Sequence, residues 1–258
     1  IITHPVETSD TYSVVAEEGD VYVNAGADGK HPGAKDLVAV GNVGLINKDY
    51  GRDPNHNVEP TNIALAFTTP NSSLSGAVLN EYAESNKNLH NSGADIYLQN
   101  GAIWNNEWIG MERPTPKKER PSGDNEAYLY KGSKVRNLVG GANPTAAGII
   151  HPIDARPITI QNYNGFVNVD YKAGTPASEE GKGQIIIQHA TDNSHVTVQG
   201  DSAKNLTDDA SYRAEMQSLA NKLQYTGNDK KLATAVQINE RITRPAAVAE
   251  LGTDAFDA

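Results

Sequence analysis

The 258-residue sequence contains no cysteine, which excludes disulfides, thiolate metal sites and cysteine nucleophiles together. It is also poor in aromatic residues (6%) and in hydrophobic residues (38%), a composition that is lean for a compact enzyme and favours an elongated fold with a thin core. No apolar run approaches the roughly 18 residues that a membrane-spanning helix needs, so no membrane span is expected within this chain. Stability must therefore come from side-chain packing and from the hydrogen bonds of β-ladders.

Positive charge is scarce, because 22 lysine and arginine residues face 32 aspartate and glutamate residues, a formal net charge of −10. A charge of this sign repels nucleic-acid phosphates and anionic lipid surfaces, so no nucleic-acid partner is expected. The composition suits a protein exposed to the outside, although solubility alone would account for it equally well. The first residues have neither the basic start nor the apolar core of a signal peptide, so any export signal is expected outside this sequence.

A recurring phrase is present instead: a short alternating β-type run, a turn rich in Asn and Gly, and another short run. It occurs in residues 94–106, 156–169 and 183–198. Asn and Gly tolerate the left-handed backbone conformation that tight turns between stacked strands require. Successive strands separated by such turns predict an all-β solenoid, which offers a long surface rather than a catalytic pocket.

The repeat divides the chain into two regions. Residues 1–90 carry short strand-like runs and form an N-terminal β region, which is either the start of the coil or a small separate β domain. Residues 91–258 form the solenoid domain. Two protruding connections are expected within it: residues 111–125, where three prolines argue against a central strand or a helix, and residues 140–152.

One amphipathic helix is expected near the C-terminus, at about residues 208–224. There the apolar residues change to a helical period, and Asp208 suits the positive end of the helix dipole. The helix either lies across the coil or covers one end of its core. Its apolar face consists of Tyr212, Met216, Leu219, Ala220 and Leu223.

Residues 95–108, in which a strand is followed by Asn-Gly-Ala and then by Trp-Asn, resemble a phrase of bacterial autotransporter passenger domains, the pertactin-like β-helical surface adhesins. Residues 129–141, 219–227 and 236–243 are similar to segments of the same proteins. The resemblance covers roughly residues 94–245, and the N-terminal third departs from it most. It implies a right-handed parallel β-helix displayed on the outer surface of a diderm bacterium after secretion through a C-terminal β-barrel, which this sequence lacks.

Alternate side chains of the coil should point inward, because successive residues of a strand face opposite sides. The residues assigned to the core on this basis are Ile96, Leu98, Ile158, Ile160, Val167, Val169, Ile185 and Ile187.

Five residues are candidates for ligand binding. Trp104 and Trp108 could form an exposed platform for stacking sugars, although two tryptophans in a thin core are more often buried packing. Lys117, Lys118 and Arg120 could form a contact patch on the first protruding connection, although a solvated run of charges on a loop is the more common explanation.

No catalytic or cofactor motif is found. The seven histidines are scattered without metal-ligand spacing, and neither a phosphate-binding loop nor a Gly-x-Ser-x-Gly elbow is present. The acidic neighbours Glu179 and Glu180 would point to opposite faces of a strand. No cofactor is expected, and Asp and Asn residues at turns could bind Ca²⁺ only weakly.

These observations favour a non-enzymatic protein of the bacterial cell surface, an extracellular adhesin whose partner is a protein or a glycan. A self-assembling fibre or surface-layer subunit is a close variant, because the open ends of a β-coil can template another copy. A polysaccharide-degrading enzyme on the same scaffold would need carboxylates and a basic residue in one groove. An inert spacer would bind nothing.

Overall fold

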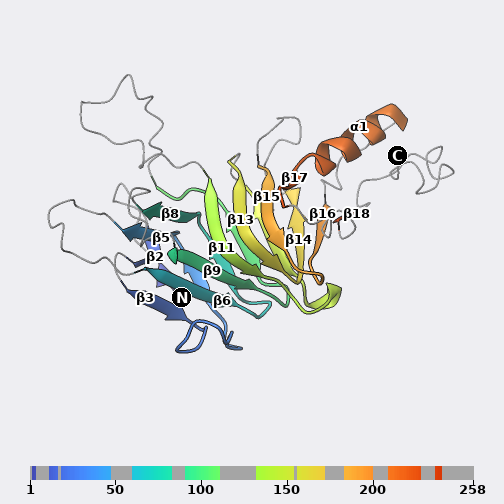
Figure 1. Cartoon of the computed structure of the whole chain (residues 1–258). Helices are drawn as coiled ribbons and strands as arrows, with labels where there is room; N and C mark the ends of the chain where they lie inside the picture. Colours follow the sequence, from blue (N-terminus) through green and yellow to red (C-terminus); the bar gives the residue numbers. More distant parts are fainter. Residues whose placement is uncertain are drawn as a thin grey trace, which may run out of the picture.

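The computed structural model describes residues 2–3, 12–16, 19–47, 60–82, 91–110, 132–153, 156–171, 183–199, 209–227 and 236–239 (Figure 1). These residues are mostly β, and they form three sheets in which every strand pair is parallel. The mostly β character predicted from the repeats is confirmed, and so are the parallel strands that the resemblance implies.

The eight strands of sheet A follow one another in the order β1 (Ile2–Thr3), β4 (Val38–Val40), β7 (Ser73–Ser75), β10 (Ile103–Asn106), β12 (Gly148–Pro152), β14 (Phe166–Asp170), β16 (His195–Gln199) and β18 (Val236–Asn239). The seven strands of sheet B are β3 (Asp20–Val23), β6 (Asn62–Phe67), β9 (Gly93–Leu98), β11 (Ser133–Val139), β13 (Ile158–Asn164), β15 (Ile185–Ala190) and β17 (Leu223–Tyr225). The three strands of sheet C are β2 (Tyr12–Ala16), β5 (Asn42–Asn47) and β8 (Val78–Tyr82).

The chain moves from sheet to sheet and returns one strand further along each time. From β9 to β16 it alternates between sheets B and A, so neighbouring strands within a sheet belong to successive passes of the chain. Parallel strands cannot be joined by a tight hairpin, and here the other sheet supplies the return path. The sheets also continue across residue 90, because β6 pairs with β9 and β7 pairs with β10.

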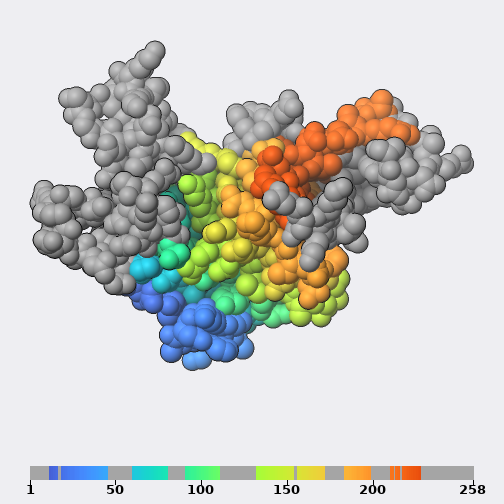
Figure 2. All heavy atoms as spheres, in the orientation of Figure 1, coloured from blue at the N-terminus to red at the C-terminus, as the bar shows by residue number. Residues whose placement is uncertain are grey.

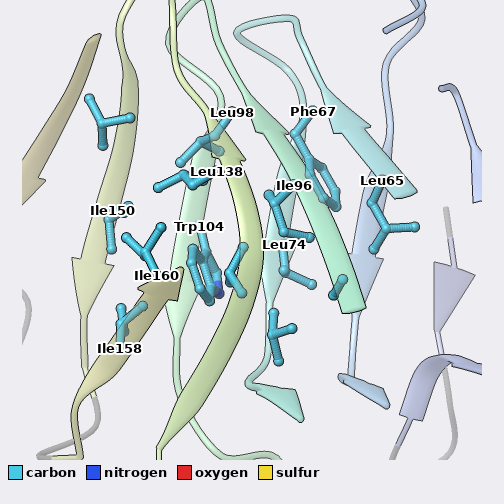
Figure 3. Close-up of a cluster of buried hydrophobic side chains, with 14 of the residues drawn as sticks. Leu65, Phe67, Leu74, Ile96, Leu98, Trp104, Leu138, Ile150, Ile158 and Ile160 are labelled. Carbon is cyan, nitrogen blue, oxygen red and sulfur yellow. The ribbon is translucent and has the colours of Figure 1, made fainter. Parts of the chain in front are cut away.

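The core lies between the sheets and is built from columns of inward side chains. One column runs through Leu65, Ile96, Leu138 and Tyr163, which face one another on β6, β9, β11 and β13. Figure 3 shows Leu65, Ile96 and Leu138 of this column together with core residues of sheet A such as Trp104. All eight residues that the alternation assigned to the core are buried, each at most 2% exposed. Period-2 alternation alone therefore identified them.

Polar turns connect sheet B to sheet A at successive levels. In residues 69–72 and 191–194 the same Thr-x-x-Ser spacing recurs, and the amides of Ser72 and Ser194 donate to the carbonyls of Thr69 and Thr191 at 2.9 and 3.1 Å. At the level between them, Asn100 adopts a φ of 53° and its side chain donates to the Thr68 carbonyl at 2.9 Å. Asn thus fits the left-handed position that the turn requires.

The expected connection at residues 140–152 is wrong in its second half. A single 3₁₀ turn (Pro144–Ala146) is present, but residues 148–152 form strand β12, in the middle of sheet A. The first residue of this strand, Gly148, has to be a glycine, because an added Cβ would overlap the Leu98 carbonyl. The other expected connection, residues 111–125, lies outside the described residues.

Helix α1 (Asp209–Ala220) corresponds to the predicted helix, which was drawn about four residues too long because Leu223 already belongs to β17. It contacts β16 and β18 near the C-terminal end of the stack (Figure 1). Leu219 is fully buried in the main core cluster, so the helix closes one end of that core with an apolar side chain. The side chains of Tyr212 and Met216 lie outside the described part. Among the described residues, no helix is long and apolar enough to cross a membrane.

Replacing Leu219 with alanine should loosen the C-terminal end of the stacked sheets. We expect a loss of about 2–3 kcal/mol of unfolding free energy, because a fully buried leucine is exchanged for a cavity. Hydrogen exchange should increase most in α1 and β17. Ala214→Gly, an exposed position on the same helix, is the control for helix propensity and should cost about 1 kcal/mol. Equal costs for the two variants would contradict the end-closing role.

Candidate functional site

The outer face of sheet B carries a connected polar cluster centred on Arg136. Its guanidinium reaches back from β11 to β9, where Nε and Nη2 donate to the two Asp95 carboxylate oxygens at 2.9 and 2.7 Å. The side chains of Arg136 and Asp95 are only 24% and 19% exposed. This bidentate contact raises the pKa of Arg136 above its ordinary value, chiefly through the hydrogen bonds to Asp95. The charges of Arg136 and Asp95 therefore neutralise each other on the face of the sheet.

The cluster continues toward the N-terminal strands. Nη1 of Arg136 donates to Asn62 Oδ1 on β6 at 2.7 Å, and Asn62 Nδ2 donates to Asp20 Oδ1 on β3 at 2.7 Å. Tyr22 donates to the other Asp20 oxygen at 2.7 Å. Burial alone would raise the pKa of Asp20, but the hydrogen bonds from Asn62 and Tyr22 outweigh it and lower that pKa. Asp20 is thereby held as an ionised hydrogen-bond acceptor.

Gly93 makes this geometry possible. Arg136 lies directly over Gly93, where an added Cβ would come within 2.6 Å of the arginine Cβ and Cδ and 2.8 Å of its Nε. Because the overlap begins at the arginine Cβ and includes the Nε that donates to Asp95, the side chain could not move aside without breaking that contact. A glycine on β9 is therefore a condition for the Arg136–Asp95 pair.

Gly93→Ala should displace Arg136 and destabilise the protein by about 1–3 kcal/mol, the usual cost of overpacking a filled site. Urea unfolding would measure the loss. In an Arg136→Ala background the same glycine substitution should cost much less, because the overlapping side chain has been removed. A Gly93→Ala cost that is unchanged in that background would show that the clash lies elsewhere.

A second feature of the same face is a shared break in the inward–outward alternation of β11, β13 and β15. In each of these strands, two consecutive side chains point outward, and the residues before and after them point inward. We call the six outward residues the amide array: Arg136 and Asn137, Gln161 and Asn162, and Gln188 and His189. Asn137, Asn162 and His189 occupy one row across the three strands.

One end of the amide array is fixed and the other is free. Asn137 donates to Asp95 at 2.7 Å, and Asn162 donates to the Asn137 side-chain oxygen at 3.0 Å. By contrast the side chains of Gln161, Gln188 and His189 are exposed and make no hydrogen bond with another described residue. Figure 2 shows the yellow-green atoms of β11 and β13 on an open face of the molecule. The outer face of sheet B thus presents polar side chains without hydrogen-bond partners in the described part of the chain, next to Asn137 and Asn162, whose side chains are held in place by the Arg136 cluster.

A loop at residues 24–34 covers the N-terminal part of this face. Tyr97 donates to the Gly29 carbonyl at 3.1 Å, and Asn24 donates to the Ala66 carbonyl at 2.9 Å. Beneath the loop, Ala64 and Ala66 point outward but are buried, 1% and 0% exposed. The open part of the face therefore begins at the Arg136 cluster.

Of the five residues proposed from the sequence, the structure describes two, Trp104 and Trp108. Trp104 is fully buried, and its Nε1 donates to the Gly76 carbonyl at 2.9 Å, so the prediction of a surface platform is wrong for this residue. Figure 3 shows it among apolar side chains of the core. Trp108 is half-buried. Lys117, Lys118 and Arg120 lie outside the described residues.

The Arg136 cluster and the amide array were not foreseen from the sequence. The available signal was two adjacent polar residues between core residues, at the same place in three strands, as in Ile160-Gln161-Asn162-Tyr163 and Ile187-Gln188-His189-Ala190. On the neighbouring sheet A, His195 stacks on Phe166 with ring centroids 4.4 Å apart. Within the described ranges, no three His, Asp or Glu side chains gather where they could hold a metal ion.

No family model, curated protein or solved structure matches this chain. The resemblance to autotransporter passenger domains therefore stays a prediction from the sequence.

Proposed function

We propose that this protein is a non-enzymatic adhesin of the bacterial cell surface, built as a right-handed parallel β-helix of the autotransporter-passenger type. The observation that carries the proposal is the amide array with its ordered row and its free polar groups. Repeated strands hold these groups on a rigid sheet, as a binding surface requires. In this proposal the partner is an extracellular glycan or protein.

The alternative of a polysaccharide-degrading enzyme meets one of its requirements, since carboxylates and a basic residue do converge in the Arg136 cluster. Their chemistry favours binding instead. A general acid needs a carboxyl group whose pKa is raised toward neutrality, whereas hydrogen bonds lower the pKa of Asp20. Asp95 accepts three hydrogen bonds, two from Arg136 and one from Asn137. We therefore assign this cluster a structural role beneath a binding face.

Adhesion is tested with fluorescent beads that carry the full chain, incubated with epithelial cell layers, with bacterial cells and with immobilised matrix proteins. Retention above that of albumin-coated beads on any of these supports the adhesin. Clumping of the beads without cells would replace it by self-association. Retention on none of them would overturn the proposal in favour of an inert spacer, and release of reducing sugars from polysaccharides would overturn it in favour of the enzyme.

A further inference from the structure

We propose that the amide array binds an uncharged polysaccharide that runs along the coil, across β11, β13 and β15. This inference rests on the proposed adhesin function and names the chemical class of its ligand.

The charges of the face select an uncharged ligand. Arg136 is paired with Asp95 at 2.7 Å, so it has no free charge to attract an anion. The uncommitted groups of the array are the neutral side-chain amides of Gln161 and Gln188 and the His189 ring. Lys134 is an exposed cation on β11, but it belongs to a chain with a net charge of −10, which repels polyanions at long range.

The hydrogen-bonding chemistry of the face fits hydroxyl groups. Each glutamine amide offers two donors and one acceptor oxygen, and a sugar hydroxyl both donates and accepts. Asn162 Nδ2 donates to the Asn137 side-chain oxygen at 3.0 Å and to the Arg136 carbonyl at 3.3 Å. These bonds fix the orientation of the Asn162 amide and leave its side-chain oxygen available as an acceptor. Such an ordered acceptor loses little conformational entropy on binding.

The spacing of the array fits a chain of sugars. Adjacent strands of a sheet lie about 4.8 Å apart, so equivalent side chains recur at that distance across the strands. Asn162 and His189 are register partners, and Gln161 and Gln188 precede them on the same strands. The repeat is comparable in length to one hexose of an extended chain. A polysaccharide lying across the strands would therefore meet the same pair of polar positions at each sugar.

Affinity electrophoresis tests this, with the full chain run in native gels that contain hydroxyethylcellulose, galactomannan, xyloglucan or arabinoxylan, and polygalacturonate as the acidic comparison. We expect retardation by at least one of the four neutral polymers. Gln161→Ala/Gln188→Ala should weaken that binding about tenfold or more, because two hydrogen-bonding groups are lost. The matched control, Asn193→Ala/Gln217→Ala, also removes two exposed amides and should bind as the unmodified chain does.

Three results would overturn the inference: no retardation by any neutral polymer, retardation by polygalacturonate alone, or equal weakening by both pairs of substitutions. The bead assay separates this failure from failure of the adhesin. Beads that are retained while all neutral polymers fail would leave the adhesin with a different ligand. If the beads are not retained, the proposed adhesin function itself is overturned.

Discussion

Trp104→Ala is expected to destabilise the protein by about 3–5 kcal/mol, the cost of deleting a large aromatic side chain from a filled core. Trp104 is fully buried on β10, in the middle of sheet A, where β7 and β12 pair with it on either side. The substitution also leaves the Gly76 carbonyl without the indole donor that lies 2.9 Å away. A buried acceptor without its partner adds to the cost of the cavity.

Urea unfolding followed by far-ultraviolet circular dichroism would measure this loss. Trp108→Ala is the matched control, because Trp108 is the only other tryptophan and is half-buried. Its removal should cost clearly less. Trp104→Phe should fall between them, since it keeps most of the apolar volume but loses the hydrogen bond and leaves a smaller cavity. If the two alanine variants unfold at the same urea concentration, Trp104 does not have the core role assigned to it.

Local pattern was sufficient to identify eight core residues, because successive strands repeat the same alternation. Ile185 and Ile187 alternate with outward residues on β15, and their neighbours on β13 do the same. By the same rule Trp104 belongs inward, since Ala102 and Asn106 on either side of it are also buried. The prediction of a sugar platform relied on the residue type of Trp104 and ignored its position in the alternation.

The strand at residues 148–152 shows where local pattern fails. Glycine at its start and proline at its end are typical of a loop. Gly148 is required there for a tertiary reason, the close approach of the Leu98 carbonyl, and Pro152 ends the strand. A sequence contains no direct sign of which backbone will pass next to a glycine, so the loop prediction followed from the composition alone.

The Arg136 cluster could not be predicted for a related reason. Asp95 and Arg136 are 41 residues apart, and they meet only because β9 and β11 are neighbours in sheet B. That neighbour relation depends on the length of each pass and on the register between passes. The single residues are ordinary polar side chains on the outward face, and their partnership appears only in three dimensions.

Asp95→Ala should cost about 2 kcal/mol of unfolding free energy. It removes the carboxylate that accepts three charge-assisted hydrogen bonds and leaves the half-buried guanidinium of Arg136 without its paired carboxylate. Arg136 keeps the Asn62 side-chain oxygen and the Asn91 carbonyl, each at 2.7 Å, which limits the loss. Arg136→Ala alone should cost a similar amount, because it exposes the opposite charge.

The double variant Asp95→Ala/Arg136→Ala should be more stable than the sum of the two single costs predicts, by about 1–2 kcal/mol, since residues in one network couple. Urea midpoints at neutral pH would give all three values. The same variants test the link between the cluster and the amide array. Without Asp95, Asn137 loses the acceptor that orders the row, so polysaccharide binding should weaken in both Asp95 variants while β-content is unchanged. Strictly additive costs would mean that the two side chains act independently, and unchanged binding would mean that the row does not depend on the pair.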